Sequence, residues 1–277
     1  MGQSGGMRYI KLLAIPCGFY LAVIVAMYFG QSWLIFPAYM VSDSRPALPD
    51  GAVQLELVTA EGDRLHGIHV SPQRSASGYK TVVIGFAGNG WHAEGMALDL
   101  RRHFPDRDIV VFNYRGYRPS GGRPSAAALL ADGLHIHDHV QQTLGPARTF
   151  AVGYSLGSGV AAYLARERPL AGLILVTPFD ALEAVAQQRY PWAPVRWLIR
   201  HHMPSVDFLR GLTLPTAVIA AERDVIVPPE RTAALRRGIG NLVLDRTLAG
   251  AQHNDIFSHP DFGSAMAEAM ERFDAKP

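Results

Sequence analysis

The chain has 277 residues, of which 48% are hydrophobic and 18% charged, so it can bury the core of one large domain or two small ones. Lys and Arg nearly balance Asp and Glu, and the net charge of +2 argues against a dedicated nucleic-acid binder. The single cysteine, Cys17, excludes an intrachain disulfide and a cysteine-based zinc cluster.

The first predicted element is an apolar helix at residues 12–30, which contain no charged residue. A bilayer core requires about 20 apolar residues in a helix, so this segment is predicted to be a transmembrane anchor. Arg8 and Lys11 precede it, and the positive-inside rule therefore places the short tail 1–11 in the cytoplasm. The rest of the chain then lies on the periplasmic or extracellular side. A cleaved signal peptide and a buried core helix remain alternatives.

Residues 31–51 are predicted to connect this anchor to a globular domain. Trp33 and Tyr39 are aromatic residues of the kind found at the headgroup level of a membrane. Residues 42–51 are rich in Pro, Asp and Ser, which is typical of a linker.

Residues 52–277 alternate short apolar segments with amphipathic ones, and the pattern predicts a mostly parallel sheet with helices on both faces. A hairpin is expected first, because strand-like segments flank the turn at Glu61-Gly62-Asp63. The predicted strands are residues 53–59, 64–70, 81–86, 109–113, 149–153, 170–177, 216–221 and 242–246. The predicted helices are residues 93–103, 125–143, 155–166, 230–237 and 264–273. In such sheets the loops at the carboxyl ends of the strands form the site.

The strongest local signal is the sequence Gly153-Tyr154-Ser155-Leu156-Gly157, which follows a predicted strand and opens a predicted helix. In this G-x-S-x-G pattern the small glycines allow a sharp turn that exposes the serine hydroxyl. The N–H of Leu156, at the start of the helix, is directed toward an oxyanion formed beside Ser155. A glycine-lined helix start that packs tightly on the sheet is the structural alternative.

A serine nucleophile requires a base and an orienting carboxylate, in the chain order serine, acid, histidine. Asp224 follows the predicted strand 216–221, and His253 follows the strand 242–246, so both fall at the edge of the sheet where Ser155 is expected. The alternatives are Glu222, Asp255 and Asp180 for the acid and His259 for the base.

These motifs resemble the α/β-hydrolase superfamily, and within it the membrane-anchored serine hydrolases of the Bem46 type and their ABHD13- and ABHD17-like relatives. The resemblance extends over nearly the whole chain. It rests on Gln31, Phe36-Pro37, Phe86-Ala-Gly-Asn-Gly90, Asn113-Tyr-Arg-Gly-Tyr117, Gly121-Gly-Arg-Pro-Ser125, Gly153–Gly157, Tyr190-Pro-Trp-Ala-Pro-Val195, Asp224-Val-Ile-Val-Pro228 and His253-Asn-Asp255. It implies that Ser155, Asp224 and His253 are nucleophile, acid and base.

The loop after the third strand supplies the second oxyanion donor in such folds, and here the N–H of Asn89 is the candidate. The chain departs from the family pattern at Ala87, where a histidine is usual, which leaves the rigidity of this loop open. Arg118 also departs from the pattern, as either a residue of the pocket mouth or a surface arginine. Gly88, Tyr154 and Arg118 are the candidates for substrate binding.

The predicted reaction is hydrolysis of a carboxylic ester or thioester through an acyl-serine intermediate, without a cofactor or metal. Residues 177–215 are too few for a full lid domain, so large or membrane-lying acyl substrates are expected, such as lysophospholipids, acylglycerols or acylated proteins. A serine peptidase or amidase, and a non-catalytic membrane-anchored scaffold, are the alternative functions. The histidines of His135-Ile-His-Asp-His139 are predicted to lie on a solvated helix face rather than to bind metal.

Overall fold

The computed structural model of the protein describes residues 4–42, 44–73 and 80–275. An eight-stranded sheet in the order β1-β2-β4-β3-β5-β6-β7-β8 forms its centre. Its strands are β1 (Val53–Val58), β2 (Arg64–Val70), β3 (Thr81–Phe86), β4 (Asp108–Phe112), β5 (Arg148–Tyr154), β6 (Gly172–Val176), β7 (Thr216–Ala221) and β8 (Leu242–Leu248).

The sheet is parallel from β4 to β8, and only β2 pairs antiparallel with its neighbours β1 and β4. The predicted hairpin and parallel sheet are thereby confirmed. The strands β3, β5, β6 and β7 are buried along nearly their whole length, because helices cover both faces. Their carboxyl ends lie at one edge of the sheet, which is the edge that carries the loops discussed below.

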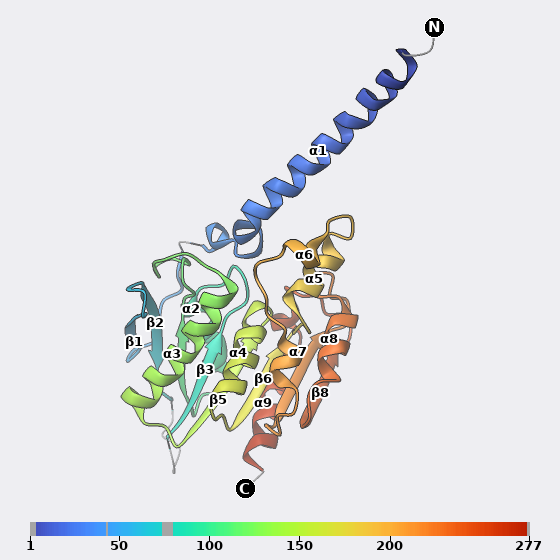
Figure 1. The fold of residues 1–277 in the computed structure, drawn as a ribbon. Helices are drawn as coiled ribbons and strands as arrows, with labels where there is room; N and C mark the ends of the chain where they lie inside the picture. Colours follow the sequence, from blue (N-terminus) through green and yellow to red (C-terminus); the bar gives the residue numbers. More distant parts are fainter. Residues whose placement is uncertain (1–3, 43, 74–79, 276–277) are drawn as a thin grey trace.

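Helices form one layer on each face of this sheet (Figure 1). The helices of the domain are α2 (Ala93–His103), α3 (Ala126–Leu144), α4 (Leu156–Glu167), α5 (Leu182–Arg189), α6 (Val195–Leu198), α7 (Ser205–Leu209), α8 (Pro229–Arg236) and α9 (Phe262–Asp274), with short 3-10 turns η1 (Ala38–Met40) and η2 (Ile256–Ser258). Buried residues of α2 and α9 share one core cluster, and those of α3, α4, α7 and α8 share the other. Alternate residues of β3, β4, β5 and β6 enter the two clusters, as period-two side-chain alternation requires.

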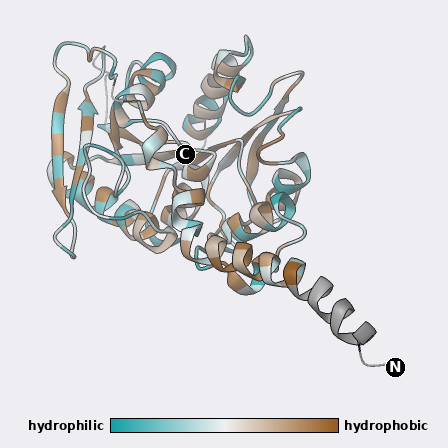
Figure 2. Cartoon of the chain, turned by 90° about the horizontal axis from the view of Figure 1, so that it is seen from above, coloured by the Kyte–Doolittle hydropathy of each residue, from teal (hydrophilic) through white to brown (hydrophobic). Residues whose placement is uncertain are grey.

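The N-terminal helix α1 (Ser4–Ile35) projects from the domain (Figure 1), and its residues Ile15–Ile35 are long and apolar enough to cross a membrane. Figure 2 shows that the part of α1 nearest the domain is mostly hydrophobic. The sequence predicts an interfacial segment from Gln31 onward, but the helix continues to Ile35. The reason is contact with the domain, since Gln31 and Phe36 are buried. Residues 1–3 of the predicted tail lie outside the described residues.

The segment between β6 and β7 contains three short helices, α5, α6 and α7. We call residues 182–199, which comprise α5, α6 and their connection, the cap. The cap lies beside the domain end of α1, and the hydroxyl of Tyr20 donates to the carbonyl oxygen of Trp192 over 3.0 Å. The helix and the cap thus form one structural unit above the sheet (Figure 1).

Candidate active site

Ser155 occupies a strained turn between β5 and α4. Its backbone angles, φ 49° and ψ −113°, lie in a region that non-glycine residues seldom adopt and that costs about 1–3 kcal/mol. The Ser155 N–H donates to the carbonyl oxygen of Val176 over 2.9 Å, which ties the turn to the neighbouring strand β6. The turn therefore holds the Ser155 side chain at the carboxyl edge of the sheet.

The two glycines of the motif are required by close backbone approach. A Cβ atom added at Gly157 would overlap the carbonyl oxygen of Phe86, and one added at Gly153 would overlap the carbonyl oxygen of Gly157. These clashes are with backbone atoms, which cannot move aside as a flexible side chain can. The glycines thus allow α4 to start directly against the ends of β3 and β5.

The structure brings Ser155, His253 and Asp224 together from three separate loops. The Nε2 atom of His253 lies 2.9 Å from Oγ of Ser155, and its Nδ1 atom lies 2.7 Å from Oδ2 of Asp224. A histidine tautomer protonated on Nδ1 satisfies both contacts, since Nδ1 then donates to the carboxylate and Nε2 accepts from the hydroxyl. This arrangement can move a proton from the serine hydroxyl to the imidazole.

Asp224 is held in place by its own loop. Its Oδ1 atom accepts hydrogen bonds from the N–H groups of Ile226 at 2.9 Å and Val227 at 2.7 Å, and only 5% of the residue is exposed. Two backbone donors on one oxygen leave the other oxygen directed at His253. The carboxylate is therefore oriented before any substrate arrives.

The alternative acids and the alternative base have other partners. Glu222 accepts from the N–H of Gly250 and Asp255 from the N–H of Gln252, so both stabilise the loop that carries His253. Asp180 accepts from the N–H of Ala181 and from Arg231. His259 contacts the carbonyl oxygen of Ala249. Burial raises the pKa of the Asp180 carboxyl, while the positive charge of Arg231 opposes that shift.

The loop after β3 lies directly beside Ser155. A Cβ atom added at Gly88 would be 3.7 Å from Cβ of Ser155 and 3.5 Å from the carbonyl oxygen of Tyr154. The candidate donor Asn89 follows Gly88 in this loop. As the first residue of α4, Leu156 has an N–H among those that find no acceptor within the helix.

Three contacts from distant segments hold this loop, although it lacks the histidine usual at position 87. The hydroxyl of Tyr114 donates to the carbonyl oxygen of Ala87 over 2.7 Å, and the hydroxyl of Tyr117 donates to Oδ1 of Asn89. The Nδ2 atom of Asn89 donates to the carbonyl oxygen of Ile35, at the end of α1, over 2.6 Å. The Asn89 side chain is thus fixed from both sides.

Tyr114 and Tyr117 are the site-supporting residues that the sequence analysis did not identify. Burial raises the pKa of both hydroxyls well above the ordinary tyrosine value, so both remain protonated donors at neutral pH. The signal was present in the Asn113–Tyr117 motif, but no local pattern relates its tyrosines to Ala87 and Asn89.

The three candidates for substrate binding differ in position. Gly88 adjoins Ser155, as described above. The side chain of Tyr154 is fully buried and its hydroxyl donates to Oδ2 of Asp99 over 2.9 Å, so the side chain points away from Ser155 and cannot contact a substrate. The Tyr154 side chain is therefore not available for substrate binding. Arg118 has an exposed side chain, and its carbonyl oxygen accepts from Arg45 over 2.7 Å.

The prediction of a solvated face for the histidine-rich segment of α3 is wrong for the middle histidine, because its side chain is buried. His137 is buried and lies 3.2 Å from Oδ1 of Asp138, whose carboxylate also accepts from Arg168 over 2.7 Å and 2.8 Å. Within residues 4–42, 44–73 and 80–275, no three His, Cys, Asp or Glu side chains are grouped as metal ligands would be.

Comparison with known proteins agrees with this fold. The profile of the family described as "alpha/beta hydrolase fold" matches residues 82–202. Together with the sheet order and a full-length relative, this match shows that the chain belongs to the α/β-hydrolase fold family. The relative is the uncharacterised protein Rv2307c of Mycobacterium tuberculosis, 33% identical over 273 residues that cover 96% of this chain and 95% of that protein.

Two further similarities are more limited. The lysophosphatidylserine lipase ABHD12 of Danio rerio is 27% identical over 143 residues, which cover 43% of this chain and 36% of the lipase. Among solved structures, the Pyrococcus furiosus esterase Pf2001 superimposes with a TM-score of 0.67 at 15% identity, covering 85% of this chain and 98% of the esterase. The similarity to the esterase, at 15% identity, concerns the fold alone.

Proposed function

We propose that the protein is a membrane-anchored serine hydrolase of the Bem46 type that cleaves carboxylic ester or thioester bonds through an acyl-serine intermediate. The observation that carries this proposal is the pair of contacts that His253 makes, one with Ser155 and one with Asp224. A serine hydroxyl that hydrogen-bonds to a carboxylate-oriented imidazole is the arrangement that activates serine as a nucleophile.

In the proposed mechanism, His253 takes the proton from Ser155 as the hydroxyl attacks the acyl carbonyl. Asp224 holds the imidazole and stabilises its cation. The same histidine then returns the proton to the leaving alcohol or thiol. A water molecule, activated by His253, attacks the acyl-serine and releases the acid together with the free Ser155 hydroxyl.

The proposed oxyanion donors are the N–H groups of Leu156 and Asn89. Removing one such donor in a serine hydrolase lowers the rate by about 10²–10³-fold. Donors must be fixed before the reaction to have this effect. The Asn89 loop meets that requirement through its contacts with Tyr114, Tyr117 and Ile35.

We further propose that α1 anchors the enzyme in a membrane, with the tail 1–11 cytoplasmic and the domain 52–277 on the opposite side. The length and apolar character of Ile15–Ile35 support an anchor, and Arg8 and Lys11 support the orientation. In this arrangement residues 12–30 lie in the membrane and residues 31–51 connect it to the domain. The test is a reporter enzyme, of a kind that works only in the cytoplasm, fused after Pro277. If this fusion is active, the orientation is contradicted.

The proposed substrates are acyl esters or thioesters derived from lipids. The name of the partially similar lysophosphatidylserine lipase is consistent with a lipid ester, and a membrane anchor brings the site close to such molecules. No cofactor is required, since the serine, histidine and aspartate carry out every proposed step.

Fluorophosphonate labelling tests the proposal, together with hydrolysis of p-nitrophenyl esters by the detergent-solubilised full chain. We expect wild-type protein to be labelled and active, and Ser155→Ala to lose the label and at least about 10⁴-fold in kcat/KM. The control is Ser264→Ala, because Ser264 is an exposed serine on α9. Equal labelling of wild type and Ser155→Ala, or an inactive wild type, would favour a non-catalytic scaffold.

A further inference from the structure

We infer that the groove between α1 and the cap binds the long acyl chain of a membrane lipid ester, so that the membrane helix itself forms part of the substrate site. This inference rests on the proposed function, and it specifies the substrate class of that site. Four observations support it: the lining of the groove, its connection to the Asn89 loop, the rigid attachment of α1, and the depth of the cap along α1.

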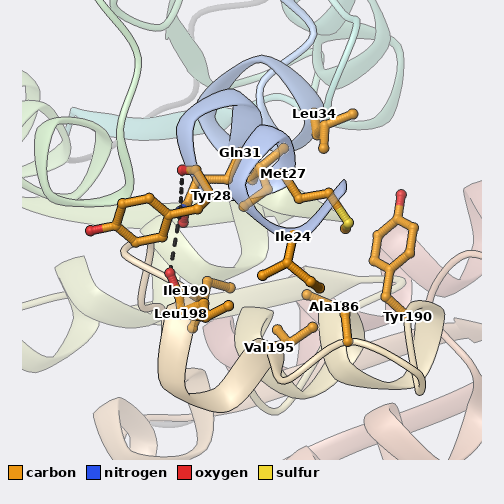
Figure 3. Close-up of a pocket in the computed structure, with 12 residues that line it drawn as sticks. Ile24, Met27, Tyr28, Gln31, Leu34, Ala186, Tyr190, Val195, Leu198 and Ile199 are labelled. Carbon is orange, nitrogen blue, oxygen red and sulfur yellow. Dashed lines mark hydrogen bonds between the residues drawn. The ribbon is translucent and has the colours of Figure 1, made fainter. Parts of the chain in front are cut away.

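The groove is partly open to solvent, has a cavity volume of about 70 Å³, and has an uncharged, largely apolar lining. Its α1 wall includes Ile24, Met27 and Leu34, and its cap wall includes Ala186, Val195 and Leu198. Figure 3 shows Ile24 directed from α1 toward Ala186 and Val195 of the cap. Because none of the residues that line it is charged, the groove favours hydrocarbon and disfavours a charged headgroup.

The length of the groove suits a long chain. Its α1 wall extends from Ile24 to Ile35, which corresponds to about 16 Å at a rise of about 1.5 Å per residue. An extended alkyl chain advances about 1.3 Å per carbon, given carbon–carbon bonds of about 1.5 Å. The α1 wall is therefore longer than an acetyl group requires and offers apolar contact along a longer chain.

One end of the groove adjoins the proposed oxyanion donor. Ile35, which lines the groove, accepts the hydrogen bond from Nδ2 of Asn89, and Gly88 in the same loop lies against Ser155. A chain that leaves an ester carbonyl at Ser155 thus reaches the Ile35 end of the groove along the loop after β3. The Ile35 end of the groove and Ser155 thus lie on either side of the Gly88–Asn89 segment.

The helix is fixed against the domain by polar contacts at the same end. Oε1 of Gln31 accepts from the N–H of Arg200 over 2.7 Å, and its Nε2 atom donates to the carbonyl oxygen of Leu198 over 3.3 Å (Figure 3). Oγ of Ser32 lies 2.8 Å from Nε2 of His201. Burial lowers the pKa of His201, so its imidazole is neutral at pH 7 and no charge is introduced here. These contacts define the width of the groove.

The cap reaches far along the apolar helix. The contact between Tyr20 and Trp192 lies fifteen residues before Ile35, which places it about 22 Å along the helix axis. Tyr20 also lies ten residues before Gly30, the end of the proposed anchor, so the tip of the cap extends about 15 Å into a bilayer core that is about 30 Å thick. The cap presents exposed aromatic side chains on this side, since Trp192 is 51% exposed and Trp197 is 71% exposed. The groove then opens directly to lipid chains.

Two adjacent substitutions on α1 test this inference. Ile24→Trp places a large ring in the groove, whereas Val25→Trp adds the same ring at a residue that is 46% exposed and does not line it. Both variants replace a β-branched aliphatic residue on the same helix, so they have similar effects on anchoring. Hydrolysis of p-nitrophenyl acetate and p-nitrophenyl palmitate is measured for each variant in the same detergent micelles.

We expect Ile24→Trp to lower kcat/KM for the palmitate ester by about tenfold or more, as excluding two methylene groups from an apolar site would do. Hydrolysis of the acetate ester, fluorophosphonate labelling and all activities of Val25→Trp should match wild type. Unchanged palmitate hydrolysis by Ile24→Trp would overturn the groove assignment and leave the serine hydrolase intact. If Ile24→Trp loses hydrolysis of both esters while its labelling stays normal, the groove assignment is also overturned. An inactive, unlabelled wild type would instead overturn the proposed function.

Discussion

The two sides of the Ser155 site are held by different means. On one side, the turn into α4 is determined by residues adjacent in the chain, since Gly153 and Gly157 allow the helix to start against the sheet. On the other side, the Asn89 loop is held by Tyr114, Tyr117 and Ile35, which are distant in sequence. A local motif identifies the first side. The second side can be recognised only when its supports are seen in three dimensions.

Substitution of the proposed acid Asp224, which orients His253 beside both sides of the site, should lower activity the most. Asp224→Asn should lower kcat by about 10⁴-fold with little change in KM, because the amide no longer favours the histidine tautomer that accepts from Ser155. Steady-state kinetics on p-nitrophenyl esters measures this change. Asp255→Asn is the matched control, since its side-chain oxygen can still accept from the N–H of Gln252. Equal losses in the two variants would contradict the assignment of Asp224.

The local side of the comparison is tested by Gly157→Ala. We expect a loss of about 3 kcal/mol in the free energy of unfolding, because the new methyl group overlaps the backbone oxygen of Phe86. Urea unfolding followed by circular dichroism measures the loss. Gly159→Ala, on the same helix, should cost less, since its methyl group meets the movable side chains of Phe179 and Met203. If the two variants are equally stable, close backbone approach is not the reason for the glycine.

The distant side is tested by Tyr117→Phe, which removes the hydroxyl that donates to Asn89. We expect kcat to fall about tenfold with KM nearly unchanged, because the Asn89 loop is then less well positioned. This is a smaller loss than the one expected when an oxyanion donor is deleted. Tyr163→Phe is the control, since Tyr163 packs on Phe208 away from this loop. A fall in stability without a fall in kcat would show that Tyr117 supports the fold and not the donor.

The smallest of these changes is expected for the Asp138–Arg168 ion pair, which is remote from both sides of the Ser155 site. Hydrogen bonding to Arg168 lowers the pKa of Asp138 from its ordinary value of 3.8 to about 2. Because the folded-state value lies below the unfolded one, this pair stabilises the protein above pH 4 and ceases to do so as the pH falls from about 4 to 2. Asp138 is partly exposed, so Asp138→Asn should cost less than about 1 kcal/mol at pH 7.

Urea unfolding of wild type and Asp138→Asn at several pH values measures that contribution. The difference in unfolding free energy should shrink as the pH is lowered through 4. A difference that stays constant or grows under acid conditions would contradict the predicted stabilisation by Arg168.

Several elements were predictable because local patterns determine them. The predicted strand at 81–86 and helix at 93–103 coincide with β3 and α2, since an apolar run flanked by turns and an amphipathic period are unambiguous over those lengths. The helix that contains the proposed anchor continues past Gly30 to Ile35. Gln31 and Ser32, which were assigned to the connecting segment, bond with Arg200 and His201 of the domain.

The parallel sheet, the turn at Ser155 and the three residue types proposed for proton transfer follow from local signals, because they depend on apolar periodicity, glycine spacing and chain order. Three other features become visible only in the folded chain: Tyr154 points away from Ser155, two tyrosines hold the Asn89 loop, and α1 and the cap line a groove. A hydrogen-bond partner or an apolar wall far away along the chain leaves no local pattern. Packing alone brings such residues together.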